Sequence, residues 1–195
     1  MPMLQVNLLS GYSSALKTRL SKSLTSVLAG ITQARPEAIT VWIQEYSSDC
    51  YSRGGESRTP GQGANAPESI VREYLTAMEN RDIDTARRHL GDGFVMAFPG
   101  SGELGSLEEL VAWSKDRYRF VKKSIDDIDV AFGMEEIIVF ARGTLLGEWP
   151  DGSEFSGVRF IDRFVMRDEY LIRQDVWNDL AITTSPTKTD NRKAQ

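Results

Sequence analysis

One stretch of the sequence, residues 56–66, constrains the fold more than any other. It runs ESRTPGQGANA, is rich in glycine, proline and small polar residues, and has no hydrophobic periodicity. Such a composition is typical of a flexible linker, because it offers almost no apolar surface to bury. The 195 residues are therefore expected to form two modules, residues 1–55 and 67–182. Residues 183–195 are equally poor in apolar side chains and are predicted to be disordered.

In the first module the hydrophobic pattern predicts a strand, a helix and a second strand. Residues 3–9 alternate as a strand, and Ser13 or Ser14 can cap a helix that Pro36 ends. Residues 39–46 then predict another strand. Two strands joined through a helix form a βαβ unit with parallel strands. A unit of about 55 residues buries too little surface to be stable alone, so we expect a homo-oligomer.

In the second module the pattern changes from helical to strand periodicity. Pro67 suits the first turn of a helix, Asp82 or Asp84 can cap a second, and Ser106 opens a capping box for a third. From about residue 125 the period falls to two, which predicts strands near 125–132, 136–147, 155–167 and 170–178. Helices followed by an antiparallel sheet are typical of an α+β domain with its helices on one face.

Composition argues against several classes of function. The net charge of -5 disfavours binding to nucleic acid or to an anionic membrane, because there is no basic excess. No apolar run approaches the roughly 20 residues that cross a bilayer, and the start of the chain lacks a signal-peptide pattern. The single cysteine, Cys50, cannot form an internal disulfide, which fits a reducing cytoplasm. With His89 as the single histidine, we expect no metal site and no cofactor.

The first module carries several features at a recognisable spacing: Pro2 after Met1, the run QVNLLSGYSSALKTRL, Pro36, the strand ending IQEY, and YSRGG. By these features residues 2–55 resemble the 4-oxalocrotonate tautomerase family. The resemblance implies that removal of Met1 frees the secondary amine of Pro2, which then acts as general base or general acid in tautomerisation. The alternative is that Pro2 is tolerated at a strand start, where it donates no hydrogen bond.

The resemblance also implies which residues bind the substrate. The family's two carboxylate-binding arginines correspond to Tyr12 and Thr40, neither of which can form a bidentate ion pair. The family's aromatic residue near the proline corresponds to Tyr51. Arg53 can bind a carboxylate or remain solvated. We therefore expect a monoacid, a phenylpyruvate-like compound or a neutral enol as substrate, rather than a dicarboxylate.

The second module contains IVREYLTAMENRDIDTARRHLGDGFVMAFPG, GTLLGEWPDGSEFSGVRFIDRFVM and LIRQDVWNDLA. By these segments residues 67–182 resemble the nuclear transport factor 2-like superfamily and its SnoaL-like branch, which includes polyketide cyclases. The resemblance implies a cone-shaped α+β barrel, in which a curved antiparallel sheet and helices enclose a mostly apolar pocket. Such cones host enzymes, binding modules and dimerisation scaffolds, so the fold alone does not decide the function. The predicted fold class is α+β throughout.

Strand alternation suggests residues for that pocket. In the strand predicted at 155–167, Asp162 shares a face with Phe160 and Phe164. In the strand predicted at 170–178, Asp175 shares a face with Trp177. A carboxylate among aromatic side chains can move protons, so both aspartates are candidate catalysts. Cross-strand ion pairs, of Asp162 with Arg163 or Arg173 and of Asp175 with Arg159, are the alternative. Trp113, Tyr118 and Trp177 are expected in the core or pocket wall, and residues 98–100 at its mouth.

Three functions follow from these patterns. The first is a tautomerase or isomerase that uses Pro2 on a small keto or enol compound, with the second module assembling the protein or binding ligand. The second is a non-catalytic protein in which the first module oligomerises and the second binds a small apolar ligand. The third is a cyclase or isomerase that uses Asp162 or Asp175. The absence of the family's two arginines favours the second and third functions, whereas Pro2, Gly11, Pro36 and the YSRGG end favour the first. We expect an enzyme of this first kind, located in the cytoplasm.

Overall fold

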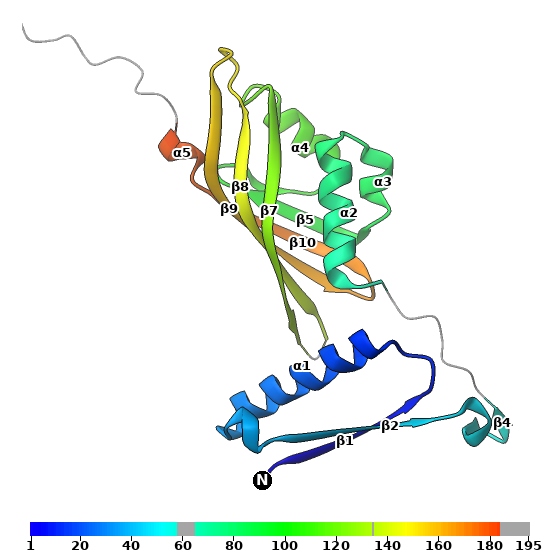
Figure 1. Ribbon diagram of the computed structural model, residues 1–195. Coiled ribbons are helices and arrows are strands. Elements are labelled where there is room, and N and C mark those ends of the chain that lie inside the picture. Colours follow the sequence, from blue (N-terminus) through cyan, green and yellow to red (C-terminus); the bar gives the residue numbers. More distant parts are fainter. Residues whose placement is uncertain (58–64, 134, 184–195) are drawn as a thin grey trace, which may run out of the picture. The chain divides into compact units, whose positions relative to one another are not determined.

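The computed structural model describes residues 1–57, 65–133 and 135–183. The chain divides into two compact units, Met1–Gly63 and Ala64–Gln195 (Figure 1). Most of the predicted linker, from residue 58 to residue 64, lies outside the described residues, as does the predicted tail from residue 184 onwards.

The first unit is a βαβ unit, as predicted. Strand β1 (Met3–Leu9) precedes helix α1 (Ser14–Thr32), and strand β2 (Thr40–Tyr46) pairs with β1 in parallel (Figure 1). The hydroxyl of Ser13 caps α1 by accepting a hydrogen bond from the backbone N–H of Leu16 at 3.2 Å. Short 3₁₀ turns and a two-stranded hairpin complete the unit: η1 (Pro36–Ala38), η2 (Ser48–Cys50), β3 (Ser52–Arg53) and β4 (Glu56–Ser57).

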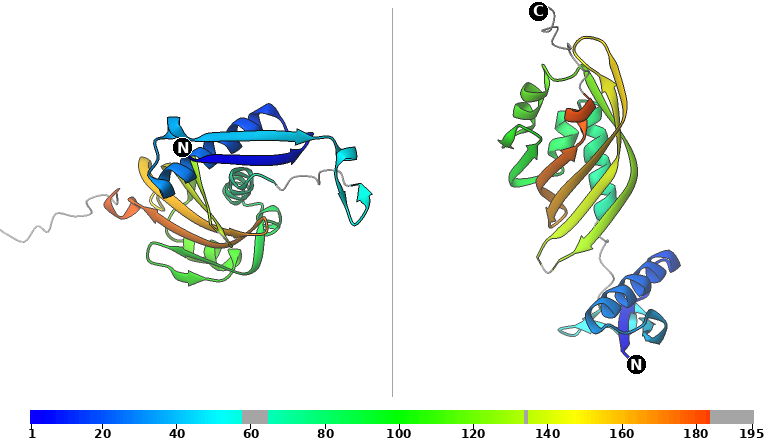
Figure 2. Two further views of the ribbon diagram at one scale, coloured as in Figure 1. Left: turned by 90° about the horizontal axis from the view of Figure 1, so that it is seen from below. Right: turned by 90° about the vertical axis from the view of Figure 1, so that its left-hand side faces the viewer.

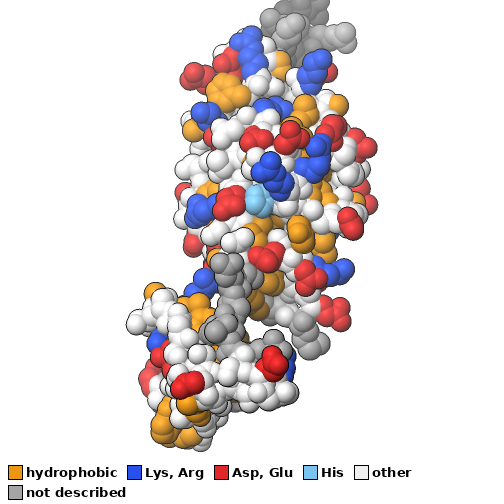
Figure 3. Space-filling model, turned by 90° about the vertical axis from the view of Figure 1, so that its right-hand side faces the viewer, with side chains coloured by type: hydrophobic (Ala, Val, Ile, Leu, Met, Phe, Trp, Pro, Cys, Tyr) orange, Lys and Arg blue, Asp and Glu red, His pale blue; other side chains and the backbone are white. Residues whose placement is uncertain are grey.

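The first unit leaves much apolar surface uncovered. No residue in 1–57 is buried, although leucines of α1 are half-covered where the helix lies on the sheet. Hydrophobic side chains are exposed at the surface of the unit (Figure 3), the most open being Met1, Ile31, Met3, Trp42 and Val27. A stable domain normally covers such surface, so the unit offers apolar area for contact with other molecules.

The second unit packs helices against one face of a curved, six-stranded sheet (Figures 1 and 2). The helices are α2 (Pro67–Glu79), α3 (Ile83–Arg87), α4 (Leu107–Ser114) and α5 (Leu180–Thr183). The strands lie in the order β6-β5-β10-β9-β8-β7, with bounds β5 (Leu90–Phe98), β6 (Gly102–Leu104), β7 (Phe120–Phe132), β8 (Ile137–Glu148), β9 (Glu154–Arg167) and β10 (Tyr170–Asn178). Helices α2, α3 and α4 lie on the concave side (Figure 2).

The predicted α+β class is confirmed, but the sheet differs from a closed antiparallel barrel in two ways. It is open, because β6 and β7 form its two edges. It is also mixed, because β5 and β10 are parallel. Strand β5 was not predicted: Gly91 and Gly93 weaken its local pattern, and its partner β10 lies far along the chain. None of the described helices combines the length and the apolar character that a membrane span requires.

The core of the second unit lies between α2 and the concave face of the sheet. Tyr74 of α2 packs edge-on against Phe164 of β9, with ring centroids 5.8 Å apart, and both side chains are buried. The strands bend where glycines permit close approach: a Cβ on Gly143 would lie 1.9 Å from the carbonyl oxygen of Ser124. This contact adjoins a bulge in β7, and bulges of this kind increase strand curvature. The curvature leaves room for a cavity beside the core.

Candidate functional site

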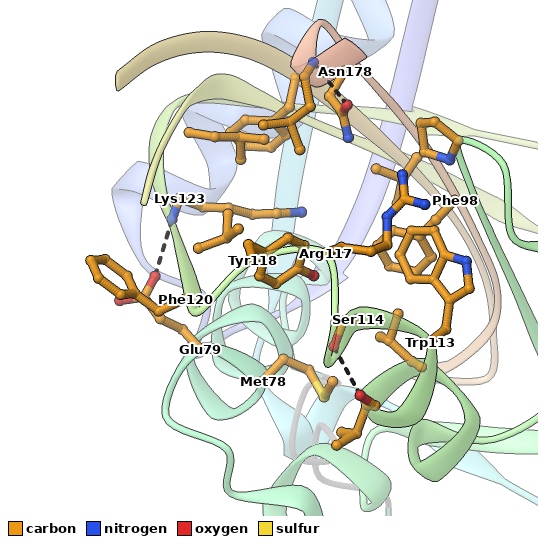
Figure 4. Close-up of a pocket in the computed structure, with 18 of the residues that line it drawn as sticks. Met78, Glu79, Phe98, Trp113, Ser114, Arg117, Tyr118, Phe120, Lys123 and Asn178 are labelled. Carbon is orange, nitrogen blue, oxygen red and sulfur yellow. Dashed lines mark hydrogen bonds between the residues drawn. The ribbon is translucent and has the colours of Figure 1, made fainter. Parts of the chain in front are cut away.

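A cavity of about 940 Å³ lies between the concave face of the sheet and the helices of the second unit (Figure 4). Its lining comes from α2, α4, β7, β8, β9, β10 and α5, and from the turn that follows β5. The lining is mostly apolar. Cavities of this size and character are typical binding sites for small organic molecules.

Aromatic side chains form much of the cavity wall. Phe98 and Trp113 contact each other with ring centroids 5.6 Å apart, and Tyr118 and Phe120 follow in the loop and strand after α4 (Figure 4). Burial raises the pKa of the Tyr118 phenol. A hydrogen bond with Ser114 and nearby arginine charges lower this pKa, but by less than burial raises it. At neutral pH this phenol is therefore a hydrogen-bond donor inside a largely aromatic wall.

A polar network borders the cavity within the sheet. Lys123 of β7 forms an ion pair through its Nζ with Oδ2 of Asp162 in β9. The amide of Gln174 in β10 donates to the same oxygen at 3.0 Å. The hydroxyl of Tyr74 in α2 in turn donates to Oε1 of Gln174, also at 3.0 Å. Four elements of the fold are thus joined by one chain of polar contacts.

The two charges of this network differ in their exposure. Asp162 is completely buried, whereas the Lys123 side chain is 20% exposed and lines the cavity. Oδ1 of Asp162 accepts no hydrogen bond from any described residue. Burial, and to a smaller extent the charge of Asp162, raises the pKa of Tyr74, so its phenol stays protonated.

Lys123 is held so that its charge borders the cavity. Its Nζ lies 4.6 Å from the ring centroid of Phe160, a cation–π contact, in addition to the ion pair with Asp162. An ammonium group has three N–H donors, and among the described residues the carboxylate of Asp162 is its hydrogen-bond acceptor. The remaining donors are available to a molecule in the cavity.

Further cationic side chains line the cavity nearer to solvent. The guanidinium of Arg117 lies 4.2 Å from the ring centroid of Trp113 (Figure 4). Arg119 pairs with Glu148, but Arg81 and Arg117 form no ion pair with any residue that the structure describes. The more exposed part of the cavity therefore presents two guanidinium groups without an ion-pair partner among the described residues, beside the carboxylates of Glu79 and Asp116.

In the first unit the strand pairing separates the predicted site residues into two groups. Pro2 is half-buried at the start of β1, and its carbonyl oxygen accepts a hydrogen bond from the N–H of Thr40 at 3.1 Å. Tyr12, Tyr51 and Arg53 follow the carboxyl ends of the two parallel strands. A seven-residue strand spans about 20 Å at roughly 3.3 Å per residue. One copy of the unit therefore does not bring Pro2 and these three residues together.

Residues 2–59 match the protein family described as Tautomerase enzyme. The match covers the described part of the first unit apart from Met1. No curated protein matches the chain.

The second unit has the fold of an NTF2-like protein. The crystal structure of TerC co-crystallised with polyporic acid aligns with a TM-score of 0.51 and 16% identity, over 60% of this chain and 95% of that chain. An NTF2-like protein of unknown function from Burkholderia pseudomallei aligns with a TM-score of 0.50 and 16% identity, over 61% of this chain and 95% of that chain. At this identity the likeness shows the fold alone. The second unit is called the NTF2-like unit below.

The cavity of the NTF2-like unit contains some of the residues suggested by the sequence. Trp113 and Tyr118 line it, as does the turn of residues 98–100. Asp162 points inward from β9 and contacts the lining residues Lys123 and Gln174, although it is not itself part of the lining. Asp162 therefore forms its ion pair with Lys123, and not with Arg163 or Arg173 as considered from the sequence.

Asp175 and Trp177 lie on the other face of the sheet. Their neighbours in β10, Gln174, Val176 and Asn178, line the cavity, so strand alternation directs Asp175 and Trp177 away from it. Trp177 is 52% exposed. Asp175 pairs with Arg163 and Arg173, at 3.1 and 2.8 Å, and not with Arg159. The sequence pattern separated the two faces of β10 but did not show which one the helices cover.

Lys123 and Gln174 were not recognised from the sequence. A signal for Lys123 was present, because Val121, Lys123 and Ile125 alternate on one face of β7 and a lysine between two inward apolar residues is unusual. Gln174 carried no comparable signal, because glutamine is mostly exposed in folded proteins and nothing in its neighbours marked this one as buried. Their contact with Asp162 depends on strands that are distant in sequence.

Proposed function

We propose that this protein is an isomerase that moves a proton on a small enolisable carbonyl compound, with the amine of Pro2 as the proton-transfer group. The match of residues 2–59 to the Tautomerase enzyme family carries this proposal. The half-buried position of Pro2 at the start of β1 supports it. After removal of Met1, an uncharged secondary amine there takes a proton from the carbon next to a carbonyl and returns it to the other end of the enol system. In its protonated form the same amine serves as a general acid.

The site around Pro2 is completed, in this proposal, by a second copy of the chain. Thr40 lies beside Pro2, whereas Tyr12, Tyr51 and Arg53 lie at the far ends of the strands. Exposed apolar side chains such as Trp42 and Ile31 supply the surface for association. With Arg53 as the cationic group among these residues, a monoacid or a neutral enol fits better than a dicarboxylate.

A kinetic comparison tests the proposal. Mass spectrometry of the intact chain is expected to show loss of Met1, and the chain is expected to accelerate ketonisation of phenylenolpyruvate. Pro2→Ala is expected to lower the rate by about 10²-fold or more, the usual contribution of a positioned acid or base. Pro67→Ala, which changes the proline in the first turn of α2, serves as the matched control and is expected to keep the rate. Retention of Met1, or full activity of Pro2→Ala, contradicts the proposal.

The cavity of the NTF2-like unit favours a second role, the binding of a small, largely apolar molecule. Oδ2 of Asp162 is already engaged by Lys123 and Gln174, and Asp175 faces away from the cavity. Binding therefore fits these positions better than a cyclase or isomerase reaction with either carboxylate as free base. If Asp162→Asn abolishes ketonisation while Pro2→Ala retains it, the chemistry belongs in the cavity and not at Pro2.

A further inference from the structure

We propose that the cavity of the NTF2-like unit binds a flat aromatic molecule bearing an anionic oxygen, such as an aryl carboxylate or an enolate, and that Lys123 binds this oxygen. The inference deepens the ligand-binding role proposed above and rests on it. It names the chemical class of the ligand and the residue that selects for its charge.

The shape and chemistry of the wall favour an aromatic ligand. Rings line the cavity on several sides, from α4, from β7 and from β9. Phe98, Trp113, Tyr118 and Phe120 belong to this wall (Figure 4). Aromatic rings pack against one another in stacked or edge-on arrangements that aliphatic molecules do not exploit. A volume of about 940 Å³ admits a ligand of two or three fused or linked rings.

Cationic side chains of the lining supply hydrogen-bond donors that can bind an anion. Four lining side chains are cationic and two are acidic: Arg81, Arg117, Arg119 and Lys123 against Glu79 and Asp116. The whole chain has the opposite balance, with a net charge of -5. Two of these cations are already paired with carboxylates outside the lining, Lys123 with Asp162 and Arg119 with Glu148. Arg81 and Arg117 lack an ion-pair partner among the described residues, so their charge is available to a ligand.

Lys123 is the cation best placed to meet a ligand inside the cavity. It occupies an inward position of β7, and its Nζ is fixed between Asp162 and the ring of Phe160. The contacts of Asp162 with Gln174, and of Gln174 with Tyr74, hold the carboxylate and so restrict where the ammonium can lie. Such prior ordering reduces the entropy that ligand binding must offset. Arg117, stacked on Trp113, adds a second cation nearer to solvent (Figure 4).

Two fluorescent probes with one aromatic skeleton test the inference on the full chain. The anionic probe is 8-anilinonaphthalene-1-sulfonate, and the neutral probe is N-phenyl-1-naphthylamine, which lacks the sulfonate. The double variant Lys123→Met/Asp162→Asn removes both charges of the ion pair and leaves no buried charge without a partner. Arg117→Gln, in an exposed loop, is a second variant that does not disturb the core. Lys122→Gln is the matched control, because Lys122 is exposed on the opposite face of the same strand.

The dissociation constant of the anionic probe is expected to rise about tenfold or more in the double variant, the usual loss when a hydrogen bond to a charged group is removed. That of the neutral probe is expected to change less than about twofold, since the apolar wall is kept. Arg117→Gln should weaken the anionic probe selectively, and Lys122→Gln should affect neither. Circular dichroism establishes that the variants are folded.

Two results overturn the inference in different ways. If the substitutions weaken both probes equally, or if Lys122→Gln weakens the anionic probe as much as the double variant does, Lys123 does not select an anion, and the cavity remains a binding site for apolar molecules. If neither probe binds the wild-type chain, the ligand-binding role of the cavity fails together with the inference. The Pro2 proposal is tested by its own assay and is unaffected by either result.

Discussion

Lys123→Met is expected to destabilise the NTF2-like unit more than any other single substitution in its polar network. Methionine keeps the unbranched shape of the lysine stem but removes the ammonium group. Asp162 is completely buried, so water cannot replace the lost cation. The carboxylate then keeps the amide of Gln174 as its one hydrogen-bond donor among the described residues. A buried charge without an ion-pair partner is one of the costliest features of a folded protein.

The two halves of the pair are expected to contribute unequally. Loss of one partner from a buried ion pair costs about 3–5 kcal/mol, and this range applies to Lys123→Met. Asp162→Asn leaves Lys123, whose side chain is 20% exposed and borders the cavity, where water can solvate it. We therefore expect Asp162→Asn to cost only about 1–2 kcal/mol, the value of a lost hydrogen bond. The double variant should be more stable than Lys123→Met alone, because neither charge remains.

Urea unfolding of the four variants measures this coupling. A Trp42→Phe background is useful, because the three remaining tryptophans, at positions 113, 149 and 177, then all lie in the NTF2-like unit. Tryptophan fluorescence thus follows that unit alone, and the four free energies of unfolding form a double-mutant cycle. The reasoning is refuted if Lys123→Met costs less than about 1 kcal/mol, or if Asp162→Asn costs more than Lys123→Met.

Two further substitutions probe close packing and burial in the same unit. Gly143→Ala places a Cβ 1.9 Å from the carbonyl oxygen of Ser124, and urea unfolding should show a loss of stability of about 1–3 kcal/mol. In the control Gly105→Ala the nearest atom is 4.0 Å from the new Cβ, and the free energy of unfolding should change by less than about 0.5 kcal/mol. Equal effects of the two would contradict the close approach of β7 and β8. Burial raises the pKa of Tyr74 in the folded unit above the ordinary tyrosine value of about 10. The protonated phenol therefore makes its full contribution to the free energy of unfolding below about pH 10. This contribution is lost as the pH rises further, because the unfolded chain then releases the proton readily and the folded chain does not. The urea midpoint should therefore fall between about pH 9.5 and pH 11.5, and this fall should be smaller in Tyr74→Phe than in Tyr170→Phe, which removes a half-exposed phenol.

Local signals predicted the helices and most of the strands. Ser13, Asp82 and Ser106 all accept hydrogen bonds from backbone N–H groups in the first turns of α1, α3 and α4. These interactions span three residues, so the order of amino acids is enough to predict them. The long strands β8, β9 and β10 likewise showed their period of two. Strand β5 was missed because its two glycines hide that period and its longer partner, β10, is not local.

The candidate sites were predictable only in part. Pro2 and the βαβ pattern are consecutive features of one short stretch, and the match to the Tautomerase enzyme family covers that stretch. In the NTF2-like unit the alternation of β9 correctly paired Asp162 with the inward-facing Phe160 and Phe164. For β10 the same alternation left two equivalent faces. Which face of β10 the helices α2 and α4 cover depends on how the layers pack, and the sequence does not show it. Asp175 was therefore placed in the pocket in error, and Gln174 was overlooked.

The amino-acid sequence alone determined where the helices of this chain start, that its first unit has a strand–helix–strand order, and that a proline precedes strand β1. Each of these features depends on neighbouring residues and therefore on short-range sterics, capping and hydrophobic periodicity. The cavity and its polar network were decided by the tertiary structure. Tyr74 and Gln174, which share a hydrogen bond, are 100 residues apart in the chain. Contacts of that range exist only once the curved sheet and the helices have packed, because only burial on the concave face brings Lys123, Asp162 and Gln174 together and sets their charges beside an apolar space.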